Sequence, residues 1–358
     1  MRGRGGAVDQ LVTQRLPSPS FWAGKRVFLT GHTGFKGGWL GLWLSALGAK
    51  VQGYALAPNT LPDLFSLARL GEVLADARGD VRDAERLRSE LAGFEPDIVL
   101  HLAAQPLVRA SYAAPLETYA TNIMGTANLL AACAGTSSVR LVGIVTSDKV
   151  YAEGPQAHAE TDRLGGHDPY SASKAAAELV AASFPFAAKL ATLRAGNVIG
   201  GGDWSADRLL PDFFRAAARG ETLRLRHPRA VRPWQHVLEA LCGYLLAVEF
   251  LWDGEARRGQ WNFGPGSQGE ADVETVIATL CGLWPGSAYQ VAADAEALHE
   301  AAILRLEAAK AQAELAWRPR LSLETALRLT AQWHRAHAAG EDMQAFSLAQ
   351  IEDYTRHD

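Results

Sequence analysis

A phenol and an ammonium stand four residues apart in the stretch Tyr-Ser-Ala-Ser-Lys, at Tyr170 and Lys174. Side chains at positions i and i+4 lie on the same face of a helix. A nearby ammonium favours the phenolate, so we expect Lys174 to lower the pKa of Tyr170 towards the working pH and make it useful in proton transfer. Because a Tyr-x-x-x-Lys pair also recurs by chance on surface helices, its meaning depends on the segments around it.

Three polar residues, Ser147, Asp148 and Lys149, follow an apolar run over residues 140–146. A run rich in Val and Ile is typical of a strand, and the carboxyl ends of parallel strands supply active sites. The Ser147 hydroxyl can hydrogen-bond a substrate hydroxyl. Asp148 and Lys149 can serve as a general acid and a general base, although two adjacent charges are more often a solvated turn.

A glycine loop, Gly-His-Thr-Gly-Phe-Lys-Gly at 31–37, stands between the first predicted strand and the first predicted helix. Glycines let the backbone turn tightly and approach a pyrophosphate, and a helix N-terminus offers free N–H groups to it. This placement predicts a dinucleotide site. The strand predicted at 51–56 ends without an acidic residue for a ribose hydroxyl and without an Arg cluster for a 2′-phosphate. The choice between NAD and NADP therefore stays open at this point. Asp80 and Val81 follow where this fold class contacts adenine.

The elements that must position these groups alternate between strands and helices. Strands are predicted at 26–30, 51–56, 97–102 and 140–146, and helices at 39–47, 118–134 and 322–336. Near-continuous apolar strands between helices indicate an α/β fold with a doubly wound parallel sheet of the Rossmann type. We expect a flexible arm over 1–20, a dinucleotide-binding domain over 21–193 and a smaller C-terminal lobe over 194–358 that binds substrate and returns segments to the sheet. The ligands should lie in the cleft between the two.

Composition narrows the function classes. The net charge of −4 gives no reason to expect a nucleic-acid partner. The three cysteines fit no metal spacing, and we expect reduced thiols and no metal site. No apolar run is long enough for a membrane span, and the first twenty residues lack the apolar stretch of a signal peptide. A cytoplasmic location with no membrane partner is the expectation.

Further motifs extend the pattern along the chain. With the loops already described, they occupy residues 24–37, 101–109, 121–126, 146–149, 168–174, 194–204, 232–239, 261–265 and 340–343. Jointly these stretches resemble the CDP-glucose 4,6-dehydratases, a family of extended short-chain dehydrogenases, and the resemblance covers nearly everything after residue 21. The Ser-Asp-Lys triplet is its specific part, because related dTDP-glucose and GDP-mannose dehydratases carry an acidic residue where Lys149 stands.

The resemblance implies an internal redox cycle on a nucleotide sugar. Tyr170, assisted by Lys174 and Ser147, would take the proton from the sugar O4 while a hydride leaves C4 for NAD. Lys149 or a neighbour would remove the C5 proton, Asp148 would protonate the departing C6 hydroxyl, and the hydride would return to C6. The implied cofactor contacts, besides Tyr170 and Lys174, are Gly31, Thr33, Gly34, Phe35, Lys36, Gly37, Asp80, Val81, Leu102, Ala103, Ala104 and Gln105. The implied substrate contacts are Gln105, Arg109, Asn197, Arg208 and Arg232; an Arg fork suits a diphosphate. His299 and Glu300 also match the pattern, without an assigned role.

Two departures from the family pattern concern the substrate. The loop 152–163 lacks the aromatic residue that the family carries where, by resemblance, this loop lies against the sugar. The stretch 178–194 is also short, by roughly ten residues, as surface loops vary. Both departures spare the catalytic residues and leave the identity of the nucleotide sugar open.

Three functions stay under consideration: 4,6-dehydration of CDP-glucose, 4-epimerisation or reduction of a nucleotide sugar on the same fold, and non-catalytic nucleotide sensing. Dehydration alone needs the Asp148–Lys149 pair, and sensing needs no Tyr–Lys pair. The Ala-rich helices predicted at 118–134 and 170–183 suit close packing, so we expect a homodimer or a dimer of dimers.

Overall fold

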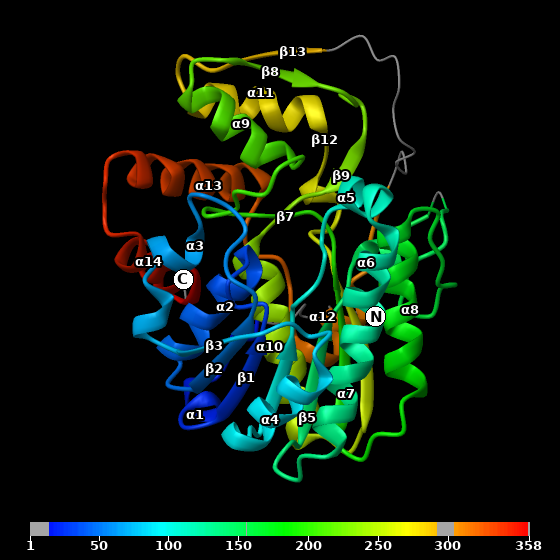
Figure 1. Cartoon of the computed structure of the whole chain (residues 1–358). Helices are drawn as coiled ribbons and strands as arrows, with labels where there is room; N and C mark the ends of the chain where they lie inside the picture. The colour runs from blue at the N-terminus through cyan, green and yellow to red at the C-terminus, as the bar shows by residue number, and fades with distance from the viewer. Residues whose placement is uncertain (1–13, 155, 292–303, 357–358) are drawn as a thin grey trace, which may run out of the picture.

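The centre of the computed structural model, which describes residues 14–154, 156–291 and 304–356, is a seven-stranded parallel sheet. The strand order is β11-β6-β5-β4-β1-β2-β3, with helices on both faces (Figure 1). The strands are β1 Arg26–Thr30, β2 Lys50–Ala55, β3 Ala75–Arg78, β4 Ile98–His101, β5 Leu141–Val145, β6 Lys189–Ala195 and β11 Arg258–Phe263. The predicted α/β class with a Rossmann-type parallel sheet is confirmed.

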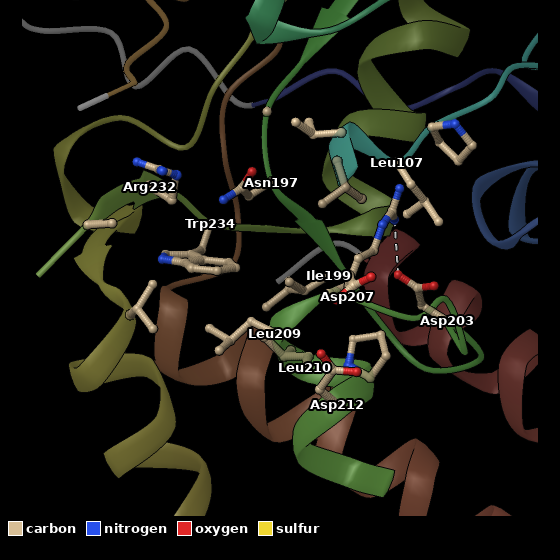
Figure 2. Close-up of a pocket in the computed structure, with 18 of the residues that line it drawn as sticks. Leu107, Asn197, Ile199, Asp203, Asp207, Leu209, Leu210, Asp212, Arg232 and Trp234 are labelled. Carbon is tan, nitrogen blue, oxygen red and sulfur yellow. Dashed lines mark hydrogen bonds and ion pairs between the residues drawn. The ribbon is translucent and has the colours of Figure 1, made fainter. Parts of the chain in front are cut away.

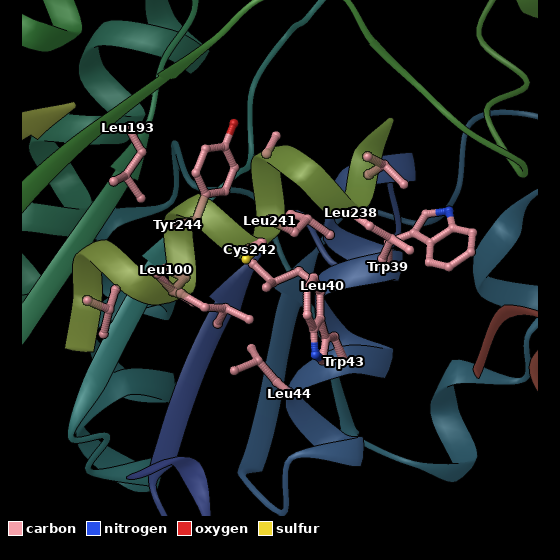
Figure 3. Packing of buried hydrophobic residues seen from close by; sticks show 14 of the residues in the cluster. Trp39, Leu40, Trp43, Leu44, Leu100, Leu193, Leu238, Leu241, Cys242 and Tyr244 are labelled. Carbon is pink, nitrogen blue, oxygen red and sulfur yellow. The ribbon is translucent and has the colours of Figure 1, made fainter. Parts of the chain in front are cut away.

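Alternate residues of a strand point to opposite faces of the sheet. Each face therefore carries apolar side chains that pack against a layer of helices. In β1, Val27 and Leu29 join one buried cluster, and Phe28 joins the other. The first cluster holds α2 Phe35–Ala46, α10 Val237–Asp253, α12 Ala309–Leu315 and α14 Met343–Thr355. Figure 3 shows Trp39 of α2 beside Leu238 of α10, and Leu40 of α2 beside Leu241 of α10. The second cluster holds α4 Ala84–Phe94, α7 Gly125–Ala134 and α8 Pro169–Ser183.

The predicted helix over 118–134 is continuous but irregular. It consists of the end of α6 Pro115–Tyr119, a π-helical turn at Ala120–Met124, and α7. Asn122 lies in the π turn, where its side chain bonds the Gln105 backbone and the Ser173 hydroxyl. A π turn inserts one residue into the helix and often marks a functional position.

The order of the sheet reverses at β1, whose neighbours are β2 on one side and β4 on the other. At such a switch point two loops diverge from the carboxyl ends of adjacent strands and leave a crevice for ligands. The glycine loop follows β1, and the Ser-Asp-Lys triplet follows β5, two strands away. The topology therefore places both motifs along one edge of the sheet.

A smaller lobe lies beyond this edge, at the top of Figure 1. Its own buried cluster joins α9 Leu209–Ala218, α11 Val273–Leu283 and α13 Leu323–Ala338. Its short strand pairs are β7 Val198–Ile199 with β10 Gln235–His236, β8 Thr222–Leu225 with β13 Ala288–Val291, and β9 Val231–Pro233 with β12 Glu270–Asp272. Between these segments the chain returns to the main sheet through α10 and β11.

The N-terminal segment differs from the expected arm where the structure describes it. Residues 14–20 pack against the body, because Glu249 of α10 accepts hydrogen bonds from the Arg15 guanidinium (2.9 Å) and the Ser18 N–H (2.7 Å). The short helix α1 Pro19–Trp22 follows, with Trp22 buried. Residues 1–13, like His299 and Glu300, lie outside the described residues. Within the described ranges no helix is long and apolar enough to cross a membrane.

Candidate active site

A cleft of about 320 Å³ opens between the carboxyl ends of the strands and the smaller lobe. Figure 2 shows Asn197, Arg232 and Trp234 on one side of it and Leu107 on another. Among the predicted site residues, those that line this cleft are Lys36, Arg109, Ser147, Asp148, Lys149, Tyr170, Asn197, Arg208 and Arg232. The fold thus brings together residues that lie as far apart as 36 and 232 in the sequence.

The end of β5 presents the polar triplet to the cleft. Ser147 caps a short 3₁₀ turn, η3 Asp148–Val150, by accepting a hydrogen bond from the Lys149 N–H (3.2 Å). Its hydroxyl donates to Asp148 Oδ1 (2.9 Å). The turn therefore fixes the backbone of Asp148 and Lys149, and all three side chains face the same cleft.

Asp148 is placed to act as an acid. Its carboxyl is buried, and Oδ2 has no hydrogen-bond partner among the described residues. Burial raises the pKa of Asp148, against the opposing charges of Lys149, Arg232 and Lys36, because a carboxylate is poorly solvated there. Gly196 makes room for it: a Cβ at this position would lie 2.8 Å from Asp148 Oδ2. A protonated carboxyl with a free oxygen can donate a proton into the cleft.

The Tyr–Lys pair lies on α8, as predicted. Asp168 caps this helix by accepting from the Ser171 N–H (2.9 Å), and Lys174 Nζ donates to the Val145 carbonyl at the end of β5 (3.3 Å). The predicted electrostatics differ, however. Burial raises the pKa of Tyr170 to about 12, although its hydrogen bond with Ser147 opposes this, and burial lowers the pKa of Lys174 to about 7. The desolvation of both groups thus outweighs the expected effect of the ammonium on the phenol.

The glycine loop fits a dinucleotide pyrophosphate. Gly31 has a φ of +77°, and a Cβ there would lie 2.7 Å from the Ala103 backbone nitrogen. A Cβ on Gly37 would lie 2.1 Å from the Gly31 oxygen, so only glycine permits this turn. Helix α2 begins after Gly34 and receives no side-chain cap. Its first N–H groups and the positive end of its dipole are therefore available to an anion.

Lys36 differs from the other loop residues because its side chain lines the substrate cleft. Its charge interacts with Asp148, Asp203 and Arg208, and also lowers the pKa of Lys174. Burial lowers the pKa of Lys36 itself to about 8. The structure thus adds a further cation to the cleft, whereas the resemblance implied that Lys36 contacts the cofactor.

The other predicted cofactor residues surround the loop. The N–H groups of Leu102 and Ala103 both bond Thr30 Oγ1 (3.1 Å each), which holds this segment beside Gly31. Asp80 forms a tight ion pair with Arg82 (2.6 Å), while Val81 is buried in the core. The predicted cofactor residues Thr33, Phe35 and Ala104 lie in the same two segments, at 31–37 and 102–105.

Gln105 is the predicted substrate residue that does not line the cleft. Its amide is engaged locally: Nε2 donates to Thr118 Oγ1 (2.9 Å), and Oε1 accepts from the Leu107 N–H (2.6 Å). Asn122 bonds its backbone on both sides. Gln105 and Asn122 thus hold the segment after β4 against α6 and α8. Sequence reasoning had quoted Asn122 only as part of a motif, and the π turn that aims it leaves no signal in residue spacing.

Three arginines of the cleft carry carboxylate partners. Arg208 pairs with Asp203 (3.0 Å). Asp207 lies between Arg109 (3.5 Å) and Arg226 (3.4 Å), and so joins the segment after β4 to the smaller lobe. These aspartates, with Thr146 and Trp234, line the cleft although sequence reasoning had not assigned them a role. For Asp203, Thr146 and Trp234 the only signal was membership of the matched stretches, and Asp207, which lies outside them, gave no signal.

The altered loop at 152–163 lies elsewhere than the resemblance implied. None of its described residues lines the cleft. Instead Tyr151 stacks on His158 (4.7 Å between ring centres), and the His158 N–H donates to the Arg305 carbonyl (3.0 Å). The missing aromatic residue therefore does not change the walls of the cleft. In the part of the chain that the structure describes, no group of three His, Cys, Asp or Glu side chains could hold a metal ion.

Comparison with known proteins agrees with this geometry. The family model for the NAD dependent epimerase/dehydratase family matches residues 27–264. CDP-glucose 4,6-dehydratase of Salmonella typhimurium is 45% identical over 94% of this chain and 97% of its own. Among solved structures, dTDP-glucose 4,6-dehydratase of Streptomyces venezuelae with NAD bound gives a TM-score of 0.75 at 26% identity, over 89% of this chain and 99% of that chain. UDP-glucose-4-epimerase of Stenotrophomonas maltophila with bound NAD gives 0.78 at 25% identity, over 88% and 99%.

Proposed function

Because this chain belongs to the NAD dependent epimerase/dehydratase family, we propose that it converts CDP-glucose to CDP-4-keto-6-deoxyglucose and water. It is a nucleotide-sugar 4,6-dehydratase, an NAD-dependent hydro-lyase. The observation that carries the proposal is a second acid–base pair, Asp148 and Lys149, in the same cleft as Tyr170. Oxidation at one carbon needs only Tyr170, whereas loss of water needs a base at C5 and an acid at C6 as well.

The residues divide the reaction between them. Tyr170 takes the proton of the C4 hydroxyl, with Ser147 and Lys174 beside it. NAD, held at the glycine loop 31–37, would supply the acceptor for the C4 hydride and the donor of that hydride to C6. The resulting 4-ketone acidifies the C5 proton, which Lys149 in its neutral form or a neighbouring group removes. Asp148, whose pKa burial raises, delivers its proton to the departing C6 hydroxyl.

The smaller lobe suits a nucleoside diphosphate. Arg208, Arg226 and Arg232 line its side of the cleft, and a guanidinium fork matches phosphate oxygens. Trp234 adds an aromatic surface on the same side (Figure 2). The choice of cytidine rests on the Salmonella enzyme, whose printed name specifies CDP-glucose. The product class is a precursor for deoxysugars such as those of O-antigens, and we propose a cytoplasmic site of synthesis.

The direct test is product formation. Purified enzyme incubated with NAD and CDP-glucose should yield a 4-keto sugar that absorbs in the ultraviolet in alkali, with no net NADH. The same assay with dTDP-, GDP- and UDP-glucose should give slower turnover. If none of the four sugars yields a ketone, the proposed function fails.

The Asp148→Asn variant separates dehydration from epimerisation or reduction on the same fold. We expect it to oxidise C4 and lose at least 100-fold in water elimination, because one general acid contributes about 10²–10⁴-fold. A 4-epimerase would keep its activity. The Tyr170→Phe variant should lose both steps, whereas unchanged biological activity in that variant would favour a sensor.

We propose that the enzyme is a homodimer, or a dimer of dimers, formed through α6, the π turn and α8. Three apolar side chains are exposed there: Leu116 (80%), Met124 (57%) and Leu179 (58%). These helices lie side by side (Figure 1), and exposed apolar patches commonly mark interfaces. Light scattering should give twice the chain mass or four times it. Leu116→Glu with Leu179→Lys should give monomers, whereas Leu61→Glu, at an equally exposed leucine elsewhere, should not. A monomeric parent enzyme would contradict the proposal.

A further inference from the structure

We propose that the buried pair Glu178–Arg194 positions the catalytic groups for the proposed reaction, by fixing the end of β5 against the catalytic helix α8. Neither side chain lines the cleft. Both are buried, with side chains 4% exposed. They are positioning residues, since they act through the groups that touch substrate and cofactor, and the inference rests on the proposed function.

The pair is fully hydrogen-bonded on its acidic side. Glu178 Oε1 accepts from Arg194 Nε (2.8 Å) and from Thr146 Oγ1 (2.6 Å), and Oε2 accepts from Arg194 Nη2 (2.8 Å). Two parallel N–H···O bonds fix the relative orientation of a guanidinium and a carboxylate as well as their distance. The Thr146 hydroxyl extends that fixed geometry to the end of β5.

The positions of these residues in the chain explain the effect. Thr146 directly precedes Ser147, Asp148 and Lys149. Glu178 lies one helical turn beyond Lys174 on α8. The Thr146–Glu178 bond therefore sets the separation between the acid–base triplet and the Tyr–Lys pair. In positioned catalysis, a displacement of about 1 Å can lower the rate 10²-fold.

The pair also anchors the loop that departs from the family pattern. Arg194 Nη1 donates to Tyr151 Oη (2.7 Å) and to the Glu160 carbonyl (3.2 Å). Asn262 of β11 accepts from Tyr151 Oη (2.7 Å) and donates its backbone N–H to Glu160 Oε1 (2.8 Å). One buried network thus joins η3, the loop 152–163, α8, β6 and β11. Most of its loop contacts use backbone atoms or Glu160, which explains how the rest of that loop can vary.

The carboxylate has a second effect on Lys174. Lys174 donates to the Val145 carbonyl of β5 and faces Lys36 of α2 and His101 of β4. Burial and Lys36 lower its pKa, whereas Glu178 raises it. Among these groups Glu178 is the anion, so its loss should lower the pKa of Lys174 further. The fraction of Lys174 that is protonated at neutral pH would then fall.

The test replaces both partners, because removing one leaves the other as an unpaired buried charge. In Glu178→Leu/Arg194→Met, kcat for CDP-glucose should fall at least 10-fold with KM little changed. The alkaline limb of the kcat–pH profile should move to lower pH by about one unit. As a control, Arg15→Met/Glu249→Leu removes an ion pair remote from the cleft and should lower stability without moving the limb. If the double variant folds and has the same kcat and the same alkaline limb of the kcat–pH profile as the parent enzyme, the proposal is overturned.

Two further measurements apply if the double variant does not fold or if the parent enzyme dehydrates none of the sugars. If the double variant does not fold, Glu178→Asp keeps the charge but withdraws the carboxylate. It should lower kcat without moving the alkaline limb, and an unchanged kcat would count against the proposal. If the parent enzyme does not dehydrate any sugar, the proposed function fails separately. The pH dependence of Lys174 acetylation, followed by peptide mass spectrometry, then tests the pair alone: the titration of Lys174 must move to lower pH in the variant.

Discussion

At the residue scale, burial decides the acid–base character of the site. Burial raises the pKa values of Asp148 and Tyr170, and it lowers the pKa of Lys174 to about 7. The residue spacing predicted which groups would meet, because i,i+4 neighbours share a helix face. The direction in which the pKa of Tyr170 shifts depends on how deeply Tyr170 and Lys174 are buried, and residue spacing does not reveal burial.

Gly196 follows β6 and offers a prediction about Asp148 alone. A Cβ at this position would lie 2.8 Å from Asp148 Oδ2 and 2.9 Å from Pro233 Cγ, so Gly196→Ala must displace the carboxyl or the ring. We expect kcat for dehydration to fall about 10²-fold, as for a displacement of about 1 Å, and stability to fall by about 1–3 kcal/mol. Oxidation at C4 should persist, because Tyr170 and Lys174 are not touched. Stopped-flow absorbance of transient NADH and the keto-product assay measure the two steps.

The matched control is Gly282→Ala on α11, where a Cβ would meet nothing within 4 Å. This variant should keep the parent rates of both steps. If Gly196→Ala dehydrates CDP-glucose at the parent rate, Asp148 Oδ2 is not the acid, because the substitution crowds that oxygen directly.

At the element scale, the sequence predicted buried central strands of the sheet but not its two edge strands. The strand predicted at 26–30 coincides with β1, and the others differ from β2, β4 and β5 by one residue at each end, because a strand covered on both faces is a continuous apolar run. The edge strand β3, Ala-Asp-Ala-Arg, carries no such run. Strand β11 pairs with β6 from more than sixty residues further along the chain, and local patterns hold no information about that pairing.

Segments whose position depends on side-chain networks were also beyond sequence reasoning. The loop 152–163 was expected against the sugar, yet Glu160 and His158 hold it beside β11 and residues 305–307. The π turn exists where Asn122 bonds both Gln105 and Ser173. In both cases the hydrogen-bond partners are distant in sequence. The periodicity of a short sequence segment therefore cannot predict where the segment lies. More of the candidate site was predictable, because its residues lie at strand ends and on the helices next to them, whose places follow from strand order.

At the scale of the whole molecule, three buried histidines set the response to acid. They are His101 on β4, His236 at the start of α10 and His334 on α13. Burial lowers the pKa of each to about 3. Each imidazole stays neutral in the folded state and takes up a proton near pH 6.5 only on unfolding. Folding stability is therefore greatest above pH 6.5 and falls as the pH decreases towards 3.

Glu239 acts in the opposite direction. Its buried carboxyl accepts from the Arg320 and Leu321 N–H groups and from Tyr354, yet burial still raises its pKa to about 7. The folded state thus holds one proton that the unfolded state lacks between about pH 4.5 and 7, and this contribution to stability is lost as the pH rises through 7. Within this set of four groups, the three histidines outweigh the carboxyl, so their joint contribution is destabilisation by acid.

The free energy of unfolding should therefore fall by about 2 kcal/mol between pH 6 and pH 5, since the unfolded state binds nearly two more protons there. Urea titrations at each pH measure it. His334→Phe keeps a ring stacked on Phe214 (3.9 Å) and removes one titrating group, so about 1 kcal/mol of that loss should disappear. His167→Gln, at an exposed histidine, should leave the loss unchanged. A parent enzyme equally stable at pH 6 and pH 5 would mean that these imidazoles are hydrated in solution, because desolvation is the largest cause of their lowered pKa values.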